Sequence, residues 1–313
     1  MPLHPSKTGR PLPGPEIDKD MTRIKKKEKE TAPKDGLCGT LYVVATPIGN
    51  LEDITLRAIR ILREVDLVAA EDTRHTKKLL SHLGISTPLI SYYKDREVVR
   101  AEQIIKRLQG GDHVALVSDA GTPGLSDPGG ILVGRARDSN IPVVPVPGPS
   151  ALASAISCAG LEETGFLFLG FLPSRSSERR HLLTSLVHEE RPLVFYESPR
   201  RLPASLKDCL TILGNRKTFW ARELTKLHEE LRHATLAELV EQIDGQVRGE
   251  SVLIIEGAGR REMPAFDDLR ELLAWYRDNS GLSLKDAVKK ITDDLGLSRS
   301  QVYKEALLVY NKE

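Results

Sequence analysis

Short apolar runs alternate with longer stretches of helical periodicity along residues 41–159. The run Leu41–Ala45 is apolar and rich in β-branched residues, which is typical of a buried strand. Similar runs predict strands at 66–70, 89–90, 114–117 and 143–146. Apolar side chains at helical spacing predict helices at 56–62, 77–83, 98–108, 130–138 and 151–159. Strands that alternate with helices indicate a mostly parallel sheet.

The alternation resumes beyond residues 160–165 and changes character near Pro264. Strands are expected at 166–171, 192–196, 217–222 and 251–256, with helices at 176–188, 202–213 and 235–243. Beyond Pro264 the pattern predicts helices only, at 266–279, 283–295 and 299–311, and Ser298 caps the last one. We therefore predict an α/β chain with domains at 39–162 and 163–259. A small helical module with helix-turn-helix character follows at 260–313.

Residues 1–38 differ in composition from the rest. They are rich in proline and charge and offer little to bury, so we expect a disordered N-terminal extension. Nine basic and six acidic residues give this segment a charge of +3. It is either a solvated tail or an arm that touches RNA.

Overall charge and cysteine content set broad limits. The 313 residues include 45 Lys and Arg against 44 Asp and Glu, and a net charge of +1 neither requires nor excludes a nucleic-acid partner. Cys38, Cys158 and Cys209 lie far apart without metal-ligand spacing, which favours the reducing cytoplasm. No apolar run approaches the roughly 18 residues that span a bilayer, and the N-terminus lacks the apolar core of a signal peptide. We expect a cytoplasmic protein with no membrane partner and no metal.

Loops rich in Gly and Pro follow three of the predicted strands. Residues 46–55 follow the first strand, residues 118–129 the fourth and residues 147–150 the fifth. The carboxyl ends of parallel strands meet at one edge of a sheet, so one ligand could contact all three loops. The 118–129 loop holds two aspartates and no lysine, whereas a phosphate cradle favours lysine. This composition favours a ligand with hydroxyls, an amine or a cationic centre over a triphosphate.

Three further segments carry charged side chains after predicted strands. Glu71–His75 suits acid/base chemistry, or else it caps the next helix. Tyr196–Arg201 ends in two arginines that suit a phosphate backbone, or else it begins a solvated helix. Ala221–His233 is dense in charge of both signs. Its His228 and His233 are five residues apart, whereas the zinc-protease motif needs four, so we expect no zinc there.

Two common enzyme signatures are missing from the sequence. No Gly-x-Gly-x-x-Gly follows the first strand, which disfavours a nicotinamide-dependent dehydrogenase. No Gly-x-Ser-x-Gly nucleophile elbow occurs either.

Six short segments, taken in order, resemble one known family. They are Thr46-Pro-Ile-Gly-Asn-Leu-Glu-Asp-Ile-Thr55, Ala70-Glu-Asp-Thr-Arg74, Ser118-Asp-Ala-Gly-Thr-Pro123, Pro147-Gly-Pro-Ser-Ala151, Tyr196-Glu-Ser-Pro199 and Arg222-Glu-Leu-Thr-Lys226. The pattern resembles the bacterial ribosomal RNA small-subunit methyltransferase I family, within the tetrapyrrole (corrin/porphyrin) methylases. The resemblance covers residues 40–257 and extends to the helical tail. The long N-terminal extension departs from it, and so does Arg200, where many relatives are expected to have His.

The resemblance implies a two-domain tetrapyrrole-methylase-like fold that binds S-adenosylmethionine between its domains. The implied reaction is methylation of the ribose 2′-hydroxyl of a cytidine in the decoding region of 16S rRNA, either as RNA or in the 30S particle. The expected donor-binding residues are Pro47, Ile48, Gly49, Ser118, Asp119, Ala120, Gly121, Thr122, Pro147, Gly148, Pro149, Ser150 and Ala151. The expected catalytic bases or orienting groups are Glu71, Asp72, Lys226 and His228, and the expected RNA contacts are Arg200, Arg201 and Arg222. The family also implies a homodimer.

Two other functions remain open from the residues alone. The same fold serves tetrapyrrole C-methyltransferases that act on a macrocycle. Against this, residues 175–232 hold twelve basic and eight acidic residues, a charge of +4, and a helical tail follows. A non-enzymatic RNA-binding protein of ribosome assembly would bind RNA without binding the donor.

Overall fold

The computed structural model describes residues 38–161, 165–243, 249–258, 268–280 and 282–310. The chain divides into two compact units, Met1–Ser150 and Ala151–Glu313. The predicted extension at 1–38 lies outside the described residues except for Cys38, which is exposed. The predicted first domain ends at residue 162, whereas the first compact unit ends at Ser150 and leaves helix α5 (Ala151–Cys158) in the second.

The first unit is built on a parallel sheet of five strands in the order β3-β2-β4-β1-β5. The strands are β1 (Leu41–Val44), β2 (Leu67–Ala70), β3 (Leu89–Ser91), β4 (Val114–Val117) and β5 (Val143–Val146). β2 and β4 are buried along their whole length, which explains their continuous apolar runs. The predicted parallel sheet is confirmed.

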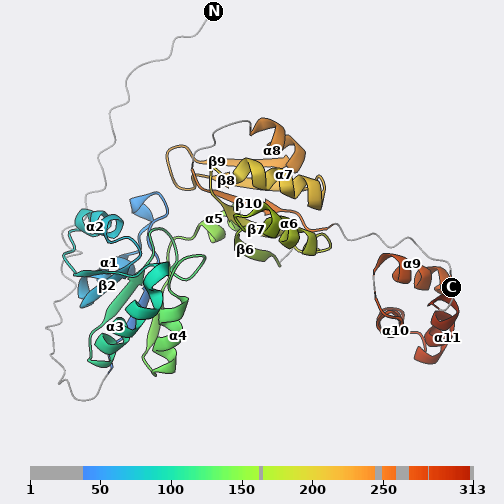
Figure 1. The fold of residues 1–313 in the computed structure, drawn as a ribbon, viewed down its shortest axis with the longest axis horizontal. Coiled ribbons are helices and arrows are strands. Elements are labelled where there is room, and N and C mark those ends of the chain that lie inside the picture. Colours follow the sequence, from blue (N-terminus) through green and yellow to red (C-terminus); the bar gives the residue numbers. More distant parts are fainter. Residues whose placement is uncertain (1–37, 162–164, 244–248, 259–267, 281, 311–313) are drawn as a thin grey trace, which may run out of the picture. The chain divides into compact units, whose positions relative to one another are not determined.

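Helices cover both faces of this first sheet (Figure 1). Helices α3 (Glu97–Gln109) and α4 (Gly130–Asp138) share one apolar core with the sheet. Helices α1 (Leu56–Glu64) and α2 (Thr73–His82) share the core on the other face. Two short 3-10 helices, Leu51–Asp53 and Lys94–Arg96, complete the unit. Every βα loop that follows a parallel strand therefore leaves the sheet at its carboxyl edge.

The second unit holds a mixed sheet in the order β6-β7-β10-β8-β9. The strands are β6 (Leu167–Phe171), β7 (Leu193–Glu197), β8 (Lys217–Arg222), β9 (Glu230–Thr235) and β10 (Ser251–Ile255). Only β6 and β7 pair in parallel, and the other three pairings are antiparallel. The sequence analysis does not predict β9. Its half-buried positions are occupied by Glu230, Arg232 and Ala234, so the strand lacks the alternation of apolar and polar residues that would identify it.

Helices α6 (Ser176–Ser185), α7 (Leu202–Leu213) and α8 (Leu236–Gln242) bury one face of the second sheet. Helix α8 opens with a capping box between Thr235 and Glu238. The helices at the end of the chain are α9 (Leu269–Asn279), α10 (Leu284–Leu295) and α11 (Arg299–Tyr310), and they share a separate apolar core. Gly296 adopts a left-handed conformation (φ 64°) at the end of α10, which produces the predicted turn before α11.

Candidate functional site

Three loops meet at the carboxyl edge of the first sheet. Thr46 and Gly121 exchange backbone hydrogen bonds, with N to O distances of 2.9 and 3.0 Å, and so join the loops after β1 and β4. The hydroxyl of Thr46 also donates to the Ser118 carbonyl at 3.2 Å. The hydroxyl of Thr122 donates to the Pro149 carbonyl at 3.3 Å and adds the loop after β5. The predicted convergence of these loops is confirmed.

Two glycines permit this close approach. Gly121 has a φ of +80°, a conformation that L side chains rarely adopt. A Cβ at Gly148 would lie 3.1 Å from the Cβ of Ala45, at the end of β1. We call the edge formed by the loops at 46–55, 118–129 and 147–150 the rim. With no side chain at Gly121 and Gly148, a ligand can come close to the backbone of the rim.

Carboxylates gather beside the rim, at the ends of β2 and β4. Asp119 Oδ1 accepts a hydrogen bond from the Asp72 amide at 2.9 Å, and Glu71 Oε2 accepts one from the Asp119 amide at 3.4 Å. Burial raises the pKa of Glu71 above its ordinary value of 4.5, and the charges of Asp127, Asp119 and Asp72 raise it further. The hydrogen bond from Asp119 opposes that change. Glu71 is therefore a stronger base than a carboxylate with an ordinary pKa.

Asp72 has a different environment. Its carboxylate caps α2 by accepting from the Arg74 amide at 2.8 Å and forms an ion pair with the Arg74 guanidinium, also at 2.8 Å. Hydrogen bonds from Arg74 lower the pKa of Asp72 to about 2. Asp72 thus caps α2, which is the second of the two roles considered for the Glu71–His75 segment, and it is a weak base at neutral pH.

The loop between β8 and β9 carries two more predicted catalytic residues. Lys226 Nζ lies 2.7 Å from Glu223 Oε1, and His228 is exposed. Glu223 and Thr225 both have left-handed backbones, with φ values of 52° and 67°, although neither is glycine. Such conformations cost of order 1–3 kcal/mol each and cluster at functional sites. Glu223 lies within the Arg222–Lys226 motif, but no sequence signal marks the left-handed backbone of this loop.

The three predicted RNA-binding arginines differ in their surroundings. Arg200 is exposed, whereas Arg201 forms an ion pair with the fully buried Glu197 at 3.2 Å and donates to the Leu172 carbonyl. Arg222 pairs with Glu230 at 2.7 Å and lies over the Trp220 ring. Only Arg200 combines exposure with a side chain that is not held in an ion pair of the described residues.

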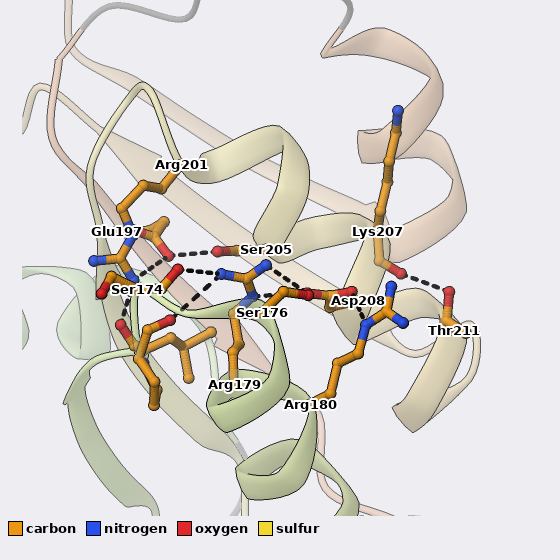
Figure 2. A network of polar contacts seen from close by, with 12 residues as sticks. Ser174, Ser176, Arg179, Arg180, Glu197, Arg201, Ser205, Lys207, Asp208 and Thr211 are labelled. Atoms are coloured by element: carbon orange, nitrogen blue, oxygen red, sulfur yellow. Dashed lines mark hydrogen bonds and ion pairs between the residues drawn. The ribbon is translucent and has the colours of Figure 1, made fainter.

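Arg201 belongs to a wider polar network in the second unit (Figure 2). Ser205 Oγ donates to Glu197 Oε2 at 2.5 Å. On the next turn of α7, Asp208 accepts from Arg179 at 2.8 Å and from Arg180 at 2.7 Å. Burial raises the pKa of Asp208, but the hydrogen bonds from Arg180 and Arg179 outweigh it and hold the pKa below 3.8. This network fixes the turn after β7 and the start of α7.

Two residues that the sequence motifs do not reveal hold the far end of the 118–129 loop. Glu97 Oε1 accepts from the Gly129 amide at 2.8 Å, and the Tyr92 hydroxyl accepts from the Leu132 amide at 3.2 Å. Tyr92 lies just beyond β3 and Glu97 opens α3, so both are remote in sequence from the loop that they support. Among the described residues, no group of three or more His, Cys, Asp or Glu forms a metal site. No helix in the same part of the chain has the length and apolarity needed to span a membrane.

Comparisons with known proteins agree with this architecture. Residues 40–240 match the family model described as Tetrapyrrole (Corrin/Porphyrin) Methylases. The chain is 45% identical over 285 residues to a protein from Escherichia coli O157:H7, "Ribosomal RNA small subunit methyltransferase I", with 89% of this chain and 98% of that protein covered. The chain belongs to the ribosomal RNA small subunit methyltransferase I family. A protein of the same name from Synechocystis sp. is 44% identical over 277 residues, which is 86% of this chain and 98% of that protein.

Solved structures support the fold of this methyltransferase I family member. The native uroporphyrin III C-methyl transferase of Thermus thermophilus superposes with a TM-score of 0.51 at 20% identity, covering 71% of this chain and 98% of that one. The same enzyme complexed with S-adenyl homocysteine gives a TM-score of 0.50 at 21% identity, again over 71% and 98% of the two chains. The predicted tetrapyrrole-methylase-like fold and the predicted family are both confirmed.

Proposed function

We propose that this chain transfers a methyl group from S-adenosylmethionine to the ribose 2′-hydroxyl of a cytidine in 16S rRNA. Membership of the methyltransferase I family is the observation that carries this proposal. The three loops at the carboxyl edge of the first sheet support it, because they bring backbone donors and acceptors to the edge where open α/β sheets bind their ligands.

The residues of the rim suit the chemistry of the donor. S-adenosylmethionine carries a sulfonium, an amine, a carboxylate and ribose hydroxyls, but no phosphate. None of residues 46–55, 118–129 and 147–150 is Lys or Arg, and Asp119 and Asp127 add negative charge. A cation is favoured there and a phosphate is not. We assign donor binding to the predicted residues of the three loops, with Thr46 and Gly121 holding the rim together.

When bound, the donor supplies an electrophilic methyl group next to a positive charge. The protein must orient the ribose hydroxyl and remove its proton. We assign proton acceptance to a carboxylate oxygen of Glu71, whose burial makes it more basic than Asp72. Lys226 is held by Glu223 and acts as a donor that orients the substrate rather than as a base. His228 is the alternative proton acceptor.

Arg200 is the foremost candidate for a contact with the RNA backbone, since Arg201 and Arg222 are engaged by Glu197 and Glu230. We further propose that the protein acts in the cytoplasm as a homodimer on the small subunit or its rRNA. Sedimentation velocity of the purified chain tests the dimer.

The deciding experiment is methyl transfer to 30S particles and to naked 16S rRNA from a strain that lacks this protein. Mass mapping of nuclease fragments should place a new methyl group on the ribose of one cytidine. Methylation of uroporphyrinogen instead, or binding of RNA without transfer, would refute the assignment.

Asp119→Asn tests the donor site separately. The amide side chain keeps an acceptor for the Asp72 amide but removes the negative charge. We expect donor affinity in equilibrium dialysis to fall about tenfold, or about 1.4 kcal/mol. Unchanged affinity would restrict Asp119 to holding the loop.

A further inference from the structure

Helix α2 presents a basic surface that none of the assignments above uses. Residues 73–94 contain four cationic side chains, at Arg74, Lys77, Lys78 and Lys94, and no Asp or Glu. The whole chain, by contrast, has nearly equal numbers of basic and acidic residues, with 45 Lys and Arg against 44 Asp and Glu. On α2 itself, Arg74, His75, Lys77, Lys78, Ser81 and His82 are exposed. The outer side of α2 therefore has a single sign of charge.

These charges are only partly compensated within the protein. Asp72 neutralises Arg74, whose side chain nevertheless stays 88% exposed. Lys77 and Lys78 have no carboxylate within ion-pair distance among the described residues. Both ammonium groups therefore remain open to an external anion.

A groove of about 610 Å³ runs beside this basic surface. Its rim includes Arg74 and Lys77 together with the hydroxyl-bearing Ser81 and Thr87, and its floor includes the apolar Leu80 and Leu89. Leu89 belongs to β3, the edge strand of the first sheet. Cations and hydroxyls along a groove match the phosphates and 2′-hydroxyls of single-stranded RNA.

The groove begins where the candidate catalytic carboxylates end. Thr73, which lines the groove, follows Glu71 and Asp72 directly and is the first residue of α2. Four residues of helical rise place Lys77 about 6 Å further along the axis. An RNA strand in the groove would therefore run into the Glu71 site rather than past a distant surface.

We propose that the α2 groove, with Lys77 in its lining and Lys78 on the exposed surface of the same helix as phosphate contacts, binds the single-stranded RNA that flanks the target cytidine. This inference rests on the proposed function and adds a location for the substrate strand. Phosphate contacts at Lys77 and Lys78 hold the strand, and the Ser81 hydroxyl provides a partner for its 2′-hydroxyls. The Thr87 hydroxyl donates to the Leu62 carbonyl at 2.6 Å, so it can serve the strand as an acceptor.

The test compares the full-length double variant Lys77→Gln/Lys78→Gln with Lys106→Gln/Lys207→Gln. The control removes two charges from exposed positions of α3 and α7, outside the groove. Binding of unmodified 16S rRNA is measured from about 50 to 200 mM salt, a range over which each lost phosphate contact changes the slope of log K against log salt by about 0.7–0.9. We expect the α2 variant to lower the slope by about 1.4–1.8, so that its affinity falls about tenfold less over that range. The control should keep the wild-type slope.

Donor binding and RNA methylation separate the possible failures. We expect the α2 variant to bind S-adenosylmethionine as the wild type does and to methylate RNA with a raised KM. If the wild-type enzyme binds and methylates RNA but the α2 variant keeps the wild-type salt slope, the proposed groove is refuted and the proposed function stands. A wild-type protein that neither binds nor methylates RNA would overturn the proposed function and the groove with it.

Discussion

The adjacent arginines after β7 should respond to substitution in opposite ways. Arg201 forms an ion pair with Glu197, whose carboxylate is fully buried, while Arg200 is exposed. Arg201→Ala removes the only cation in ion-pair distance of Glu197 among the described residues. Arg200→Ala leaves the contacts of Glu197 and Arg201 intact, because none of them involves the Arg200 side chain. We therefore expect a loss of stability from the first substitution and a loss of RNA binding from the second.

The size of the stability change follows from the contacts that remain. Removing one partner of a fully buried ion pair costs about 3–5 kcal/mol. Arg201 is 30% exposed, and Glu197 keeps hydrogen bonds from the Ser205 hydroxyl and the Ser198 amide. We therefore expect Arg201→Ala to lower the free energy of unfolding by about 2–3 kcal/mol. Arg200→Ala should change it by less than about 0.5 kcal/mol.

Urea unfolding followed by the fluorescence of Trp220 measures this difference. Trp220 is 4% exposed in the same core as α7, and Trp275→Phe in every protein removes the second tryptophan signal. In RNA binding, Arg200→Ala should lower the salt slope by about 0.7–0.9 and Arg201→Ala should not. Equal stability of the two variants, or a lower salt slope for Arg201→Ala, would refute the division of roles.

Three further outcomes are expected. Gly249→Ala should impair methyl transfer. Gly249 has a φ of +84°, and a Cβ there would lie 2.2 Å from Glu223 Cγ, so the substitution would displace Glu223, the partner of Lys226. An unchanged kcat would contradict this expectation. The pKa of Asp208 is lowered in the folded state, so its stabilisation is complete above its unfolded pKa of about 3.9 and is lost as the pH falls through the folded value. Acid titration of Asp208→Asn should show a smaller loss of stability below about pH 4 than the wild type does. The pKa of Glu71 is raised, so the acid limb of kcat/KM should lie above pH 4.5 and vanish in Glu71→Gln, and persistence of that limb would assign proton acceptance elsewhere.

The periodicity of the sequence predicts most of the fold but not its second sheet in full. Parallel strands such as β2 and β4 are buried on both faces, so their apolar runs are unmistakable. β9 has only one protected face, and its Glu230 and Arg232 resemble a polar loop. The direction of β8 and β10 depends on long-range pairing, which local periodicity does not contain.

The candidate site divides along similar lines. The convergence of three loops follows from parallel strands alone, so it is predictable from the order of the motifs. The roles of individual charged residues are not, because they depend on partners that are distant in sequence. Asp119 reaches the amide of Asp72, and Glu197 holds Arg201 inside the second unit. The basic surface of α2 is visible in the sequence, but the groove beside it needs β3, which follows in the chain and lies alongside β2.

The two backbone hydrogen bonds between Thr46 and Gly121 leave the loops after β1 and β4 little freedom to rearrange independently. A ligand that enters such a rim meets a surface already shaped, so less conformational entropy is lost on association. Exchange of these two amide hydrogens with deuterium should therefore be slow before any donor is added, and it should slow little more afterwards.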